Sequence, residues 1–244
     1  MKKSKTSLLI TSGCSFTETR IQKTWPLHLE KYLEPKNVIH TGLGCQGNGM
    51  ISRKTIHAVH TALKTHKPKQ LLVGVMWSGP SRHEQYSKDD PNFAHNIDGW
   101  MDNPVKIIDQ DLGGWIIYNS YWKIPQAKNY YKQVYDPVYA QILTLEHIIR
   151  TQNYLKLHKI KYFMSTYTKE VLELRDNPNL DHLYEQIDFD NFLPVEGEYE
   201  WALNECKLPW TSPDYHPSIE QHDEFTKQII LPFVKDKYNV DSII

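Results

Sequence analysis

The segment 69–77 limits the fold of this chain more than any other, because it ends in the nearly continuous apolar run Leu71-Leu72-Val73-Gly74-Val75-Met76-Trp77. A run of this length with no polar alternation is typical of a strand that is covered on both faces. Strands of this kind occur in parallel sheets, whose connections are usually helices. The segment therefore predicts an α/β protein.

Short apolar runs and segments with helical spacing alternate along the rest of the chain. This order favours a doubly wound, mostly parallel sheet between two layers of helices, which is a three-layer α/β/α sandwich. The last predicted helix begins after Ser218, a residue type that caps helix N-termini. The predicted strands cover residues 7–11, 38–39, 69–77 and 161–166, and the predicted helices cover residues 25–33, 50–64, 139–157 and about 219–235.

The composition indicates an ordinary soluble domain. The 244 residues contain no evident linker, so we expect a single domain. A formal net charge of -1 gives no reason to expect nucleic acid as a partner, and no stretch reaches the roughly 20 apolar residues of a membrane span. Three cysteines without disulfide or zinc spacing, and the lack of a signal-like segment, favour a cytoplasmic location.

Two loops far apart in the sequence carry residues suited to nucleophilic catalysis. Gly13-Cys14-Ser15-Phe16-Thr17 follows the first predicted strand, and Asp214-Tyr215-His216-Pro217-Ser218 precedes the last predicted helix. In doubly wound folds the site lies where loops leave the carboxyl ends of the strands. Neighbouring side chains on an extended segment point to opposite sides, so Cys14 should face the core if Ser15 faces the cleft.

These blocks, together with the glycine-rich segment 42–48, resemble the SGNH (GDSL-type) hydrolases in the order in which they occur. The resemblance implies a flavodoxin-like fold and ester hydrolysis without a metal or organic cofactor. It makes Ser15 the nucleophile, His216 the general base and Asp214 the residue that orients His216. Backbone N–H groups of Ser15 and of Gly44 or Gly47 would form the oxyanion hole.

The chain departs from the family pattern at three places. Cys14 replaces the usual aspartate of the first block, and a single residue separates Asp214 from His216 where the family has two. The third block usually supplies an asparagine to the oxyanion hole, but this chain has Trp77-Ser78-Gly79 there. Ser78 or Asn48 is the candidate replacement, since loss of one donor lowers turnover by about 100-fold to 1,000-fold.

The expected substrate is a small acyl ester, with an acylated glycan as a narrower option. Trp77 and Arg82 are expected to contact it, although Arg82 is also placed to form a surface ion pair with Glu84. The alternative is a non-catalytic binding or structural protein on the same scaffold. Because the Gly-Cys-Ser-Phe-Thr form resembles phage-encoded members of the family, this alternative includes a virion-associated role.

The region from about residue 82 to 137 has weak periodicity and many aromatic residues, so we expect a partly helical insertion. Its Trp and Tyr rings have three uses that the sequence does not separate. They suit stacking on sugar rings, burial against a partner protein, or plain packing over the sheet.

Overall fold

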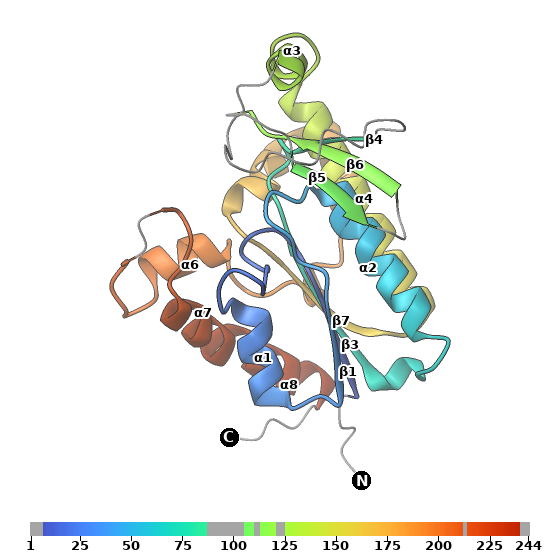
Figure 1. Cartoon of the computed structure of the whole chain (residues 1–244), viewed down its shortest axis with the longest axis vertical. Helices are drawn as coiled ribbons and strands as arrows, with labels where there is room; N and C mark the ends of the chain where they lie inside the picture. Colours follow the sequence, from blue (N-terminus) through green and yellow to red (C-terminus); the bar gives the residue numbers. More distant parts are fainter. Residues whose placement is uncertain (1–6, 87–104, 110–112, 121–124, 212–213, 240–244) are drawn as a thin grey trace.

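A computed structural model describes residues 7–86, 105–109, 113–120, 125–211 and 214–239 (Figure 1). Its central sheet has four strands, all parallel, in the order β2-β1-β3-β7. Leu8 pairs with Asn37 on one side and Leu71 on the other, and Gly74 pairs with Phe163. The strands are β1 (Leu8–Ser12), β2 (Asn37–His40), β3 (Leu71–Trp77) and β7 (Lys161–Thr166).

Helices cover both faces of this sheet, as Figure 1 shows, and the predicted three-layer sandwich is confirmed. Val73 and Val75 of β3 pack with residues of α2 and α4, whereas Leu72 and Met76 pack with residues of α1, α7 and α8. Every residue of β3 is buried because both faces are covered. The covering helices are α1 (Trp25–Leu33), α2 (Asn48–Ala62), α4 (Pro137–Leu157), α7 (Ile219–Phe225) and α8 (Leu231–Tyr238).

Gly74 is required in the middle of the sheet. A Cβ at this position would lie 2.5 Å from Phe163 Cζ and 2.9 Å from Trp25 Cη2. The rings of Phe163 and Trp25 meet edge to face with centroids 5.7 Å apart. The missing side chain therefore lets two large rings pack directly on the sheet.

Short helical segments connect the larger elements. A capping box formed by Ser218 and Gln221 starts α7, which confirms the expected cap, and η6 continues α7 into α8 as a π-helical turn. The predicted final helix is thus one continuous helical segment, in which a π-helical turn separates two α-helices. These segments are η1 (Pro68–Gln70), η3 (Lys169–Asp176), η4 (Pro178–Leu180), α5 (Asp181–Tyr184), η5 (Phe189–Asn191), α6 (Glu198–Asn204) and η6 (Thr226–Ile230).

The described part of the insertion contains β4 (His83–Tyr86), β5 (Val105–Asp109), β6 (Gly113–Tyr118) and α3 (Pro125–Gln133). The three strands form an antiparallel sheet in the order β4-β6-β5, which the weak sequence periodicity did not reveal. Trp100, Tyr121 and Trp122 of the predicted aromatic set lie outside the described residues.

The insertion's described tyrosines pack on one another and on one histidine. The ring of His83 stacks on Tyr130 with centroids 3.8 Å apart and on Tyr118 at 5.9 Å. Tyr131 contacts Tyr130 at 5.0 Å and Tyr135 at 5.3 Å. These contacts favour the packing use of the aromatic rings.

Among the residues described, no helix combines the length and apolar character needed to cross a membrane.

Candidate active site

The loop after β1 presents Ser15 at the carboxyl edge of the sheet. Its tight turn is closed by the Thr17 N–H, which donates to Cys14 O at 2.9 Å. A Cβ on Gly13 would lie 2.2 Å from Thr17 Oγ1 and 2.9 Å from the Met76 carbonyl oxygen, so this corner requires glycine. Cys14 is fully buried in the core while Ser15 is partly exposed, which confirms the expected opposite orientations.

The structure brings Ser15 and His216 together although 201 residues separate them in the sequence. His216 Nε2 lies 2.8 Å from Ser15 Oγ, and His216 Nδ1 lies 3.0 Å from Asp214 Oδ1. Asp214 Oδ1 also accepts the backbone N–H of His216 at 2.9 Å. The single residue between Asp214 and His216 therefore permits a local turn in which one carboxylate oxygen faces both the backbone N–H and the ring.

Solvent reaches this group of residues to different degrees. The His216 side chain is 31% exposed, whereas the Asp214 side chain is 60% exposed. The ring of Phe16, itself buried, lies 5.0 Å from the His216 ring. A serine hydroxyl bonded to an imidazole that contacts a carboxylate is an arrangement suited to general-base activation of the serine.

The Gly44 N–H, predicted for the oxyanion hole, is already engaged. It donates to Glu18 Oε2 at 2.7 Å, and the other oxygen of this buried carboxylate pairs with Arg20. The prediction for Gly44 is therefore wrong in this structure. Gly47 is the N-cap residue of α2, and a Cβ there would lie 2.8 Å from Glu84 Oε1. The roles of the Gly47 and Ser15 backbone N–H groups stay predictions.

Asn48 and Ser78, the proposed replacements for the missing asparagine, bind each other. Asn48 Nδ2 donates to the Ser78 carbonyl oxygen at 2.8 Å and to Thr144 Oγ1 at 3.1 Å, and Asn48 Oδ1 accepts the Ser78 N–H at 2.7 Å. Within the described part of the chain, Ser78 Oγ is enclosed and has no hydrogen-bond partner. Both oxyanion predictions are wrong, because the Asn48 amide joins the end of β3 to α2 and α4 and the Ser78 hydroxyl is enclosed in the protein.

Trp77 was predicted to contact substrate, and this is also wrong. Its side chain is 0% exposed, and its Nε1–H points at Met164 Sδ, 3.4 Å away in the core. Arg82 is partly buried; it donates to the Gln46 carbonyl oxygen at 3.0 Å and lies over the Tyr167 ring at 5.6 Å. A role for Arg82 in substrate binding stays a prediction.

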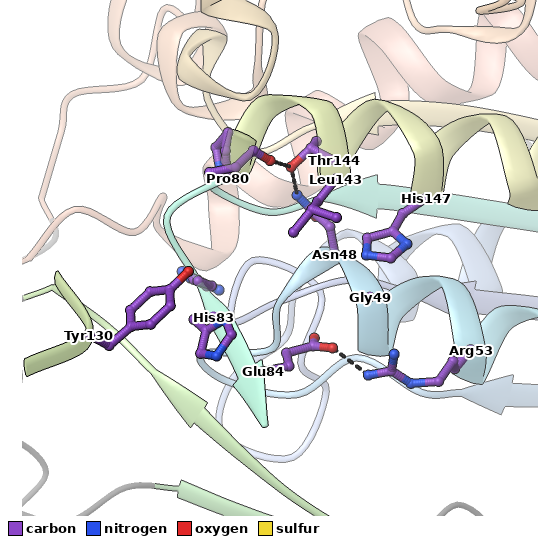
Figure 2. Close-up of a pocket in the computed structure, with 12 residues that line it drawn as sticks. Asn48, Gly49, Arg53, Pro80, His83, Glu84, Tyr130, Leu143, Thr144 and His147 are labelled. Atoms are coloured by element: carbon purple, nitrogen blue, oxygen red, sulfur yellow. Dashed lines mark hydrogen bonds and ion pairs between the residues drawn. The ribbon is translucent and has the colours of Figure 1, made fainter. Parts of the chain in front are cut away.

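A cavity of about 140 Å³ lies between α2, α4 and β4 (Figure 2). Glu84 extends from β4 to the start of α2, where it accepts the Met50 N–H at 2.7 Å and pairs with Arg53. Burial raises the pKa of Glu84, although Arg53 opposes this change. Arg82 and Asn48 line this cavity, but Ser15, Asp214 and His216 do not.

Sequence reasoning missed a second acid–histidine contact, between Glu198 of α6 and His222 of α7. His222 Nδ1 lies 2.6 Å from Glu198 Oε1, and both side chains are 0% exposed. Burial raises the pKa of Glu198, and the charges of His222 and His216 partly offset this effect. No local pattern pointed to this pair, since its members are ordinary polar residues on two short helices.

In the residues that the structure describes, no cluster of three or more His, Cys, Asp or Glu side chains is arranged to hold a metal ion.

Comparisons with known proteins add little. No protein-family model and no curated protein sequence matches the chain. A solved structure from Desulfitobacterium hafniense DCB-2, described as a "putative lipolytic protein of G-D-S-L family", is similar with a TM-score of 0.47 and 11% identity. The likeness covers 91% of this chain and 96% of the other. Because the identity and TM-score are low, the function proposed below depends on the geometry of the site.

Proposed function

We propose that this protein is a serine ester hydrolase that transfers a small acyl group from an ester to water. The observation that carries the proposal is the 2.8 Å contact between Ser15 Oγ and His216 Nε2, with Asp214 on the other ring nitrogen. This arrangement supplies a nucleophile, a base and an orienting carboxylate in one connected group.

The reaction follows from the protons that these atoms exchange. His216 Nε2 accepts the Ser15 proton as Oγ attacks the ester carbonyl carbon, while the Nδ1–H donates to Asp214. The resulting imidazolium returns the proton to the departing alcohol, and an acyl-serine ester is left. A water molecule, deprotonated by the same imidazole, then attacks this ester and releases the carboxylic acid and free Ser15.

Stabilisation of the oxyanion is expected to limit the rate. The Gly44 N–H and the Asn48 side-chain amide are used in internal contacts, and the Ser78 hydroxyl is enclosed, which leaves the predicted N–H groups of Ser15 and Gly47. Loss of one donor costs about 100-fold to 1,000-fold in turnover, so we expect a slow enzyme. The same observation favours the second candidate, a non-catalytic binding protein that keeps the scaffold.

An acylated glycan is the narrower substrate proposal. Tyr215, between Asp214 and His216, is 78% exposed, and its ring centroid lies 6.3 Å from that of Tyr199. The Tyr199 ring in turn contacts Trp210 at 5.4 Å. These rings, unlike those of the insertion, belong to α6 and to the segment that carries His216, and they suit contact with the face of a sugar ring.

Hydrolysis of a chromogenic acetyl ester tests the main proposal. Ser15→Ala should lower kcat by at least about 1,000-fold, because it removes the nucleophile. Ser81→Ala, which changes a serine of the loop between β3 and β4, is the matched control and should leave kcat unchanged. Equal rates for Ser15→Ala and the parent protein, or no turnover by the parent, would refute the hydrolase proposal in favour of the binding protein.

A further inference from the structure

The buried pair of Glu198 and His222 lies on the two helices that flank the segment carrying His216, the proposed general base. Glu198 is the first residue of α6, and His222 lies in α7. Residues 205–218 connect the two helices and include Asp214 and His216. The 2.6 Å contact between Glu198 Oε1 and His222 Nδ1 therefore joins the two helices that flank this segment.

Stability alone does not explain why such a pair is buried. Moving two ionisable groups out of water costs several kcal/mol for each ion, and apolar residues of similar size often stabilise a fold as well or better. The pair is also incompletely satisfied, because Glu198 Oε2 and His222 Nε2 have no hydrogen-bond partner among the described residues. A buried pair of this kind suggests a role in fixing one arrangement of the helices.

Further hydrogen bonds anchor the helix that carries each member of the pair. The N–H of Tyr199, next to Glu198, donates to the Tyr167 carbonyl oxygen directly after β7 at 2.9 Å, which anchors the start of α6 to the sheet. On the other side, α7 begins at Ser218, two residues after His216. Gln221 Nε2 adds a second buried link by donating to the Ala202 carbonyl oxygen at 3.0 Å.

The ring of Phe16 connects the pair to the catalytic residues. Phe16 follows Ser15, and its centroid lies 5.0 Å from the His216 ring and 6.4 Å from the His222 ring. A shift of His222 would thus change the packing of the ring that lies against His216. Because near-attack geometry tolerates little error, a displacement of about 1 Å can lower a rate about 100-fold.

We propose that Glu198 and His222 are positioning residues that hold α7, and with it His216, within hydrogen-bond distance of Ser15. This inference depends on the proposed hydrolase function. The polar contact fixes the relative position of α6 and α7 in a way that apolar packing of equal volume does not, since a short hydrogen bond defines both distance and direction.

Two variants separate positioning from stability. Glu198→Gln keeps the size of the side chain, and the double change Glu198→Leu with His222→Phe replaces the polar pair by apolar groups. We expect kcat for the chromogenic ester to fall about 10-fold in the first variant and about 100-fold in the second, with KM changed less than about twofold. Thermal unfolding measures whether each variant is folded.

Asp188→Asn is the control for a general loss of stability. Asp188 accepts hydrogen bonds from Tyr162 and Asn191 and pairs with Lys156, near the start of β7 and away from the edge that carries Ser15. This substitution should lower the unfolding temperature and leave kcat unchanged. Loss of kcat in Asp188→Asn equal to that in Glu198→Gln would overturn the positioning role, because any destabilisation would then suffice.

A second readout does not require turnover. The imidazole nitrogen signals of His216 in an NMR spectrum, assigned with His216→Gln, report its contacts with Ser15 and Asp214. We expect them to change in both pair variants and to persist in Asp188→Asn. If the parent protein shows no esterase activity, the hydrolase proposal fails and these signals still decide the positioning role.

The inference is overturned if the folded double variant has the same kcat as the parent protein. If the parent protein has no turnover, the inference is overturned when the folded double variant shows the same His216 signals as the parent. Should the double variant not fold, Glu198→Gln decides by the same readouts. An unchanged kcat and unchanged signals in Glu198→Gln would then refute the positioning role.

Discussion

Replacing His147 with glutamine should make this protein less sensitive to acid. His147 lies on α4 and lines the cavity beside Arg53 and Glu84 (Figure 2). Burial lowers the pKa of His147 from 6.5 to about 4, and the charges of Arg150 and Arg53 contribute to the same change. The folded protein therefore keeps this imidazole neutral at pH values where the unfolded chain protonates it.

The size of the effect follows from the two pKa values of His147. Between pH 6.5 and about 4 the unfolded state binds more protons than the folded state, so the free energy of unfolding falls as the pH falls. At 1.36 kcal/mol for each pH unit, the loss by pH 4.5 is about 2–3 kcal/mol. This is a large part of the roughly 5–15 kcal/mol that stabilises a typical domain.

Urea unfolding at pH 7.5 and pH 4.5, at constant ionic strength, measures this difference. Other groups make both proteins acid-sensitive, but the parent should lose about 2–3 kcal/mol more than His147→Gln between the two pH values. His182→Gln, which changes an exposed histidine of α5, should lose as much as the parent. If His147→Gln also loses as much as the parent, burial of His147 does not disfavour its charged form and the reasoning is refuted.

Two further predictions concern the site. Asp214→Ala should lower kcat about 10-fold to 100-fold, because Asp214 is largely exposed and water screens its charge. This loss is smaller than the loss of about 10⁴-fold that is typical of a buried triad aspartate. A loss equal to that of Ser15→Ala in the acetyl ester assay would contradict this prediction. Asn48→Ala should destabilise the protein by about 2–4 kcal/mol in urea unfolding, since it leaves buried groups of Ser78 without partners. Its kcat at a temperature where the variant is folded should stay within about threefold of the parent value, whereas a 100-fold loss would restore Asn48 to the oxyanion hole.

The central sheet could be predicted because its signals are local. Residues 71–77 are apolar without interruption, and the strand covers Leu71–Trp77. Residues 25–33 combine helical spacing with proline near the start, and α1 has the same bounds. The antiparallel sheet of the insertion could not be predicted in this way, because its strands are short and pair with partners on separate segments.

The candidate site was predictable only in part. Ser15 and His216 could be singled out because Ser15 follows a clear strand and His216 precedes a clear helix. The chemistry of serine and histidine then suggested the roles of nucleophile and general base. The engagement of Gly44 by Glu18 had no such signal, since any buried carboxylate within reach satisfies a backbone N–H. The pairing of Asn48 with Thr144, 96 residues away, likewise depends on how α2 packs against α4.

Local signals in the sequence establish the order of strands and helices and the two loops that carry Ser15 and His216, because apolar periodicity and turn residues act over a few neighbouring positions. Only the packing of the whole chain settles which polar groups are paired inside the protein and which, such as those of Ser15 and His216, stay partly exposed. Burial makes every unpaired donor or acceptor costly, so packing selects partners across the whole chain. Glu198 and His222 acquire their position behind His216 only through that packing.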